Sequence, residues 1–109
     1  VSPLREKNIE HFEAPVKGSK GFFKYDDLCN LECLFASHNL IKDIFGISQM
    51  ATLRELNLSF NMIVDISPIE ELDLLEKLFL NRNKIQILDP IKKLTSLQAI
   101  GLFHNEIFN

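Results

Sequence analysis

Apolar residues along the chain recur with a spacing of 22 residues. When the sequence is placed in rows of 22 from Leu31, four segments align without gaps: LECLFASHNLI, LRELNLSFNMI, LEKLFLNRNKI and LQAIGLFHNEI. The first, fourth, sixth and eleventh columns are apolar in every row, and three more apolar columns lie between these segments. Because only 46% of the residues are apolar, seven unbroken columns indicate internal repeats.

Each row predicts a short strand followed by a tight turn. Leu56 and Leu58 alternate with Asn57, which predicts a strand with one buried face. After each strand, apolar residues three apart predict a 3₁₀-like or short helical segment packed on the same core. Pro68 and Pro90 suit the start of such a segment, where a fixed φ and a missing N–H cost little. One row cannot bury both faces, so the rows are expected to stack.

The rows resemble the leucine-rich repeat pattern L-x-x-L-x-L-x-x-N-x-L over residues 31–109. Their length is similar to that of the 22-residue class, typified by the leucine-rich regulatory subunit of protein phosphatase-1 and the axonemal dynein leucine-rich light chain. Bacterial internalins share that class, and DISPI at Asp65 to Ile69 is similar to them. The resemblance implies an α/β solenoid, right-handed, with a parallel β-sheet on its concave face and short 3₁₀, helical or irregular convex segments.

The 22-residue frame also predicts boundaries. Four repeats are expected at residues 31–52, 53–74, 75–96 and, truncated, 97–109. Residues 1–30 are expected to form an N-terminal cap or degenerate repeat, because the frame places Ile9, Phe12 and Ala14 in apolar columns. Since no capping segment follows the fourth strand, we expect a section of a longer chain whose remainder caps this end, with a partner or self-association as alternatives.

The ninth column is asparagine in every row: Asn39, Asn61, Asn83 and Asn105. An asparagine amide can pair backbone groups that leave the sheet at a tight turn and would otherwise be buried unpaired. The family resemblance implies a structural ladder between turns. A polar binding column is the less favoured alternative.

Side chains between the buried leucines are expected to line the concave face. The candidate partner-binding residues are Phe35, Ser37, His38, Glu55, Asn57, Ser59, Phe60, Lys77, Phe79, Asn81, Arg82, Phe103 and His104. Aromatic side chains near an arginine are the usual anchors of protein interfaces. For Phe60, the alternative is stacking on its neighbours in the adjacent repeats.

Composition argues against other classes of function. The net charge is −3 with interspersed signs, so binding of nucleic acid or an anionic membrane is not expected. Cys29 and Cys33 lack a second ligand pair for zinc, and we favour free thiols in a reducing compartment over a disulfide. His38 and His104 share a column but lie three strands, roughly 14 Å, apart. No catalytic residue, cofactor or metal is therefore predicted.

The expected function is that of a protein-protein interaction scaffold or regulatory adaptor, which binds another protein through the concave face. The family resemblance implies this role, and the expected location is cytoplasmic, with ciliary and nuclear variants. Two alternatives remain: a bacterial surface adhesin similar to the internalins, and a subunit of a ribonucleoprotein or axonemal complex.

Overall fold

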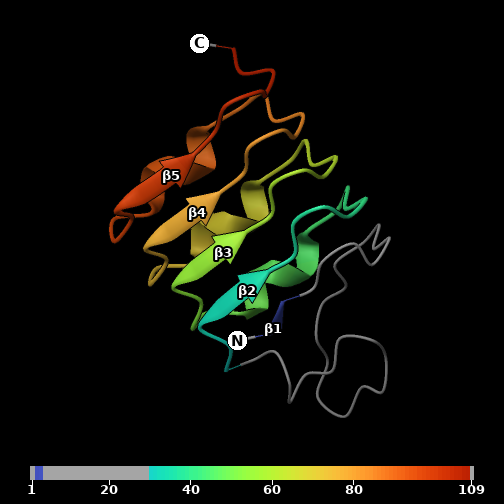
Figure 1. Cartoon of the computed structure of the whole chain (residues 1–109). Coiled ribbons are helices and arrows are strands. Elements are labelled where there is room, and N and C mark those ends of the chain that lie inside the picture. The colour runs from blue at the N-terminus through green and yellow to red at the C-terminus, as the bar shows by residue number, and fades with distance from the viewer. Residues whose placement is uncertain (1, 4–29, 109) are drawn as a thin grey trace.

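The computed structural model describes residues 2–3 and 30–108, and in them five short parallel strands form one sheet (Figure 1). The strands follow chain order: β1 (Ser2–Pro3), β2 (Cys33–Phe35), β3 (Glu55–Asn57), β4 (Lys77–Phe79) and β5 (Ala99–Gly101). Three 3₁₀ helices connect the last four strands: η1 (Phe45–Gln49), η2 (Ser67–Glu71) and η3 (Asp89–Lys93). The predicted leucine-rich repeat solenoid, with strands on one side and 3₁₀ segments on the other, is confirmed.

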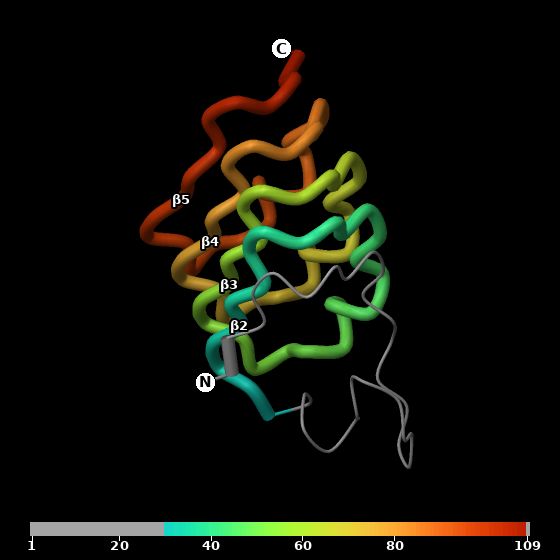
Figure 2. Tube along the Cα trace, turned by 45° about the vertical axis from the view of Figure 1, so that its right-hand side comes forward, coloured from blue at the N-terminus to red at the C-terminus, as the bar shows by residue number. Residues whose placement is uncertain are grey.

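The strand register reproduces the 22-residue frame. Leu34 pairs with Leu56, Leu56 with Leu78, and Leu78 with Ile100, so each row of the sequence becomes one coil. The coils stack one above another, as the tube in Figure 2 shows. The Arg54 carbonyl accepts the N–H groups of both Glu76 and Lys77, at 2.7 and 3.0 Å, and equivalent pairs join the neighbouring coils. Parallel strands of only three residues are thereby held to a single register.

The 3₁₀ helices begin where the sequence placed prolines and aspartates. Pro68 and Pro90 occupy the first turns of η2 and η3, as predicted. In the preceding turn, Asp65 Oδ1 accepts the Ser67 N–H at 2.9 Å, and Asp43 Oδ1 accepts the Phe45 N–H at the same distance. A short side chain that pairs a free N–H in this way defines where each segment starts.

The core lies between the sheet and the 3₁₀ helices. Its members are the apolar columns of the first three rows, and most of them are inaccessible to solvent: Leu34, Ala36, Ile41, Ile47, Met50, Leu53, Leu56, Leu58, Ile63, Ile69, Leu72, Leu75, Leu78, Leu80 and Ile85. Ile100 departs from this pattern, because its side chain is 42% exposed. β5 has a paired neighbour on one side only among the described residues, so no side chain from a further coil covers Ile100.

The strand beside β2 lies outside the 22-residue frame. Ser2 and Pro3 pair with Leu34 and Phe35, whereas the frame extended backwards would have brought Phe12 to that position. Phe12, Ile9 and Ala14 lie outside the described residues, so the predicted N-terminal cap stays a prediction. The edge of β2 is nevertheless paired, which removes one row of unsatisfied backbone groups.

Candidate partner-binding face

The concave face is formed by the third and fifth columns, the outward-pointing residues of β2 to β5. These residues are Cys33, Phe35, Glu55, Asn57, Lys77, Phe79, Ala99 and Gly101. Phe35 and Phe79 are half-buried, and Lys77 is exposed beside its register partner Glu55. The sheet thus brings together phenylalanine, asparagine and opposite charges on one surface, as the predicted columns require.

Asparagines in the ninth column join each turn to the coil before it. Asn61 Nδ2 lies 2.8 Å from the Leu58 carbonyl oxygen in its own turn and 3.1 Å from the Ala36 carbonyl oxygen in the preceding coil. Its Oδ1 accepts the N–H of Ile41 at 3.0 Å. Asn83 and Asn105 repeat this arrangement one and two coils further on, while Asn39 donates within its own turn. Because Asn61 is only 7% exposed, its bonds serve the fold and leave little surface for a partner.

Seventh-column side chains also bond to backbone, which sequence reasoning missed. Ser59 is only 6% exposed, contrary to the expectation that this column points outward, and its hydroxyl accepts the Asn81 N–H at 3.1 Å. Asn81 Oδ1 in turn accepts the Phe103 N–H at 3.1 Å. Ser37 begins the column and is half-buried. The signal was available, since serine and asparagine are the residues that pair turn backbone, but the column lacks a single repeated residue.

Eighth-column residues occupy the left-handed region of the backbone. His38, Phe60, Arg82 and His104 have φ values between 57° and 60°. This conformation costs residues other than glycine about 1–2 kcal/mol, so the turn imposes it on side chains that do not favour it. All four side chains are exposed at the ends of the strands. They therefore form the rim of the concave face and do not lie within the sheet.

Three of these rim side chains stack on one another. The rings of His38 and Phe60 lie 4.2 Å apart at an interplanar angle of 15°. The Arg82 guanidinium carbon lies 5.5 Å from the centre of the Phe60 ring, within the range of a cation–π contact. Phe60 therefore packs on its neighbours from adjacent coils, as the alternative prediction for this residue stated. In the last coil, Phe103 is 61% exposed and meets His104 edge to face at 5.3 Å.

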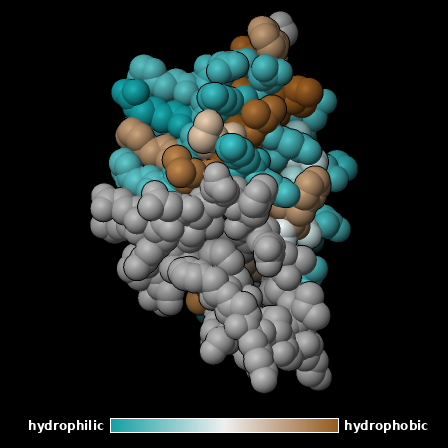
Figure 3. Space-filling view, turned by 90° about the vertical axis from the view of Figure 1, so that its right-hand side faces the viewer, coloured by the Kyte–Doolittle hydropathy of each residue, from teal (hydrophilic) through white to brown (hydrophobic). Residues whose placement is uncertain are grey.

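Exposed apolar side chains also lie away from the concave face. The largest are Phe45, Ile87 and Phe108, which are exposed by 65%, 64% and 73%. On the face shown in Figure 3, apolar side chains are interspersed with hydrophilic ones over the described part of the chain. Sequence reasoning did not select these residues, because they belong to columns without an unbroken apolar or aromatic pattern.

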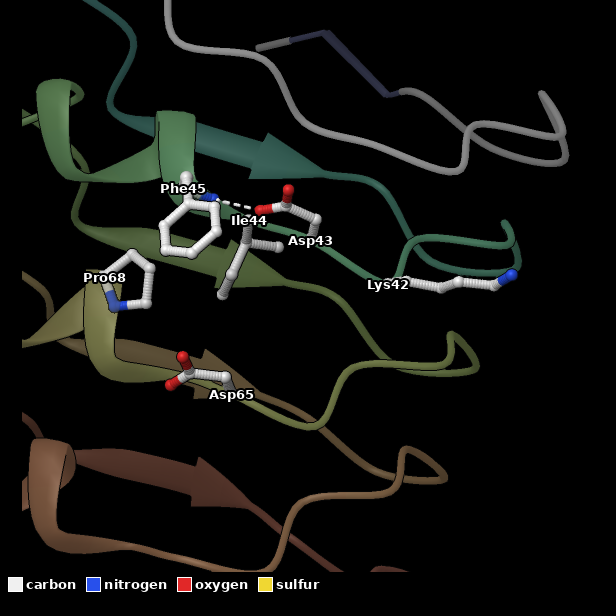
Figure 4. A pocket seen from close by; sticks show the side chains of 6 residues that line it. All are labelled: Lys42, Asp43, Ile44, Phe45, Asp65 and Pro68. Atoms are coloured by element: carbon white, nitrogen blue, oxygen red, sulfur yellow. Dashed lines mark hydrogen bonds between the residues drawn. The ribbon is translucent and has the colours of Figure 1, made fainter.

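A shallow hollow lies beside the 3₁₀ helices, and Figure 4 shows the Phe45 and Pro68 rings facing it, with Asp43 and Asp65. Both aspartates accept backbone N–H groups at the starts of η1 and η2. The two aspartates of this hollow therefore have a structural role, which is to fix the starts of the 3₁₀ helices.

The described residues offer no assembled reaction centre. They contain no group of three or more His, Cys, Asp or Glu side chains placed to hold a metal ion. Cys33 is a free thiol at the start of β2, and Cys29 lies outside the described residues. Among helices of the described part, none has the length and apolar character needed to cross a membrane.

Gly101 allows the Asn81 side chain to lie against β5. A Cβ at residue 101 would lie 2.8 Å from both Oδ1 and Nδ2 of Asn81. We expect Gly101→Ala to lower the free energy of unfolding by about 1 kcal/mol, because Asn81 must rotate and lose its bond to the Phe103 N–H. Denaturant titration measures this, and in an Asn81→Ala background the same change should cost little. An equal loss in both backgrounds would contradict the contact.

Comparison with known proteins agrees with this geometry. Residues 29–72 match the model of the family described as leucine-rich repeats in two copies. Internalin C2 of Listeria monocytogenes is similar, with 31% identity and a TM-score of 0.68 over 69% of this chain and 33% of that one. Internalin F of the same bacterium has 25% identity and a TM-score of 0.73 over 74% and 24% of the two chains. A comparison with curated protein sequences found no match.

The present chain spans a minor part of either internalin. The similarity therefore bears on the repeat architecture of the described coils. Repeat columns, a continuous parallel sheet with 3₁₀ connections, and the family match all identify the same structural unit. Residues 29–72 belong to the leucine-rich repeat family, and the described coils share its solenoid fold.

Proposed function

We propose that the concave face binds a partner protein, so that the chain acts as an interaction scaffold or adaptor. The observation that carries this proposal is the presence of phenylalanines on this surface: half-buried Phe35 and Phe79 on β2 and β4, and the more exposed Phe103 just beyond the end of β5. Aromatic side chains supply much of the energy of protein interfaces because they bury a large area with few rotatable bonds. Leucine-rich repeat domains are typical protein-interaction modules, which supports the proposal at the level of the family.

The proposal is tested by a triple variant, Phe35→Ala/Phe79→Ala/Phe103→Ala. In a pull-down from source extract, we expect recovery of a specifically bound protein to fall at least tenfold, since loss of an interface anchor costs about 2 kcal/mol or more. The matched control is Phe45→Ala/Ile87→Ala/Phe108→Ala, which removes three exposed apolar side chains away from the concave face.

Circular dichroism establishes that both variants are folded. The control should recover the partner as the native chain does. Equal recovery of all bound proteins by the native chain and the concave-face variant would contradict the proposal, whatever the control shows.

A second candidate is a surface adhesin similar to the internalins. The similarity to two internalins supports it. Both candidates use the concave face and differ in the location of the partner. For the adaptor the partner lies in the cytoplasm, whereas for the adhesin it lies outside the cell.

A further inference from the structure

The concave face is hollowed where β2, β3 and β4 end. This hollow, about 300 Å³ in volume, is lined by residues of three consecutive coils, among them His38, Asn57, Phe60, Phe79 and Asn81. Phe79 of the sheet and the stacked rim residues His38 and Phe60 all line it. A protruding side chain of a bound protein would meet it first, and its chemistry therefore bears on the choice of partner.

Three side-chain oxygens around the hollow each accept one backbone N–H. Asn57 Oδ1 accepts the Ser59 N–H at 3.0 Å, and the Ser59 hydroxyl accepts the Asn81 N–H. Asn81 Oδ1 accepts the Phe103 N–H. Because an N–H can bond only to the oxygen of each amide, these contacts fix which end of each asparagine is the Nδ2 group.

Hydrogen-bond donors, in contrast, are left over. The Nδ2 groups of Asn57 and Asn81 donate to no residue in the described part of the chain, and both side chains are only half-buried. Each Nδ2 carries two N–H donors. Two amide donors from neighbouring coils thus remain for a group that can only accept hydrogen bonds.

The charge at the rim has the sign that such an acceptor requires. Arg82 lies over Phe60, a wall of the hollow, and no carboxylate in residues 30–108 lies within salt-bridge distance of it. In contrast, Arg54 and Lys93 are paired with glutamates. Glu55 and Lys77 are register partners at the starts of β3 and β4, the strand ends away from the hollow, and their opposite charges offset each other.

Aromatic walls suit the stem of an acidic side chain. Phe79 and the stacked pair His38 and Phe60 line the hollow, so methylene groups can pack against the Phe79 ring and the edges of the stacked pair while the head group reaches the donors. A carboxylate is planar and accepts several hydrogen bonds at once, and its bonds to charged donors are stronger than neutral ones. A lysine or arginine would meet unpaired donors and a like charge.

We propose that this hollow receives the carboxylate of an aspartate or glutamate side chain from an extended segment of the partner protein. Asn57 and Asn81 donate to the carboxylate, Arg82 supplies the opposite charge, and the rings of Phe60 and Phe79 hold the stem. The inference rests on the proposed function and adds the chemistry of the partner to it.

The test uses the intact chain to select from a displayed library of short random peptides. Three variants are compared: Arg82→Asn, which keeps a residue tolerant of the left-handed backbone, the control Lys84→Asn, and the concave-face triple phenylalanine variant. Neither cation lines the hollow itself, but Arg82 lies over the lining residue Phe60. Lys84 is an exposed cation without such a contact, so its substitution removes the same charge elsewhere.

We expect the selected peptides to be enriched in aspartate or glutamate. Arg82→Asn should weaken binding of a selected peptide about tenfold, the effect of one charge-assisted hydrogen bond, and Lys84→Asn should not. Replacing the acid of the peptide by its amide should weaken binding to the native chain by a similar factor. The same replacement should have little further effect on the Arg82→Asn variant, because the two groups interact.

The other outcomes separate this inference from the proposed function. Peptides that depend on the three phenylalanines but show no acidic enrichment, or that Arg82→Asn and Lys84→Asn weaken equally, would overturn the inference alone. Peptides retained equally by the concave-face variant, or a library from which nothing is retained, would count against both.

Discussion

Leu56→Ala should lower the free energy of unfolding by about 2–5 kcal/mol, the cost of deleting a fully buried leucine and leaving a cavity. Leu56 lies in the middle of the sheet, between Leu34 and Leu78, and none of its side chain is exposed. Coils on both sides hold their positions through the backbone bonds between strands, so they cannot close the cavity fully. Guanidinium titration with an unchanged slope measures the loss.

Ile100→Ala is the matched control for this prediction. Ile100 occupies the same column one coil beyond Leu78, but 42% of it is exposed. We expect a loss of about 1 kcal/mol, because part of the deleted surface was already in contact with water. Similar losses of unfolding free energy for Leu56→Ala and Ile100→Ala would contradict the difference in burial between the two side chains.

Asn61→Ala is the second large prediction, with an expected loss of about 1–3 kcal/mol. The substitution removes the two Nδ2 N–H donors, which are shared among the Ala36, Leu58 and Ser59 carbonyls, and one acceptance by Oδ1. The Ile41 N–H would then be buried without a partner, which costs more than the bond itself contributed. Thermal or denaturant unfolding measures the change.

Asn105→Ala provides the comparison for the asparagine column. Its side chain makes equivalent bonds to the Leu80 and Leu102 carbonyls, but it is only half-buried at the last turn. Water can replace part of what the side chain supplied there, so the loss should be smaller than for Asn61→Ala. An unchanged denaturation midpoint for Asn61→Ala would rule out a stabilising role for this column.

The 22-residue frame predicted the strand register without any spatial information. Leu34, Leu56 and Leu78 fell in one column because each coil must place the same side chain in the same place against its neighbour. The prolines of η2 and η3 followed from local backbone preference. The frame did not predict β1, because pairing at the edge of β2 is set by which segment reaches it and not by the repeat.

The candidate site was less accessible to the same reasoning. Columns predicted which residues share the concave face, but they could not show that Ser59 is buried or that Asn81 leans over Gly101. Those features depend on contacts between side chains and backbone of different coils, and the sequence of one repeat does not specify such contacts. Sequence columns also left the backbone conformation of Phe60 and Arg82 open, since neither residue type favours a left-handed turn.

Periodicity alone determined the repeat length, the strand register and the core columns of the first three rows, because stacked coils repeat the same contacts at a fixed interval. Tertiary structure decided which polar groups remain available. The Oδ1 atoms of Asn57 and Asn81 accept backbone N–H groups, and their Nδ2 groups donate to no described residue. Arg82 stacks on Phe60 without a carboxylate partner in the described residues. The physical reason is that hydrogen-bond satisfaction is settled only when neighbouring coils meet, and no local pattern in the chain specifies it.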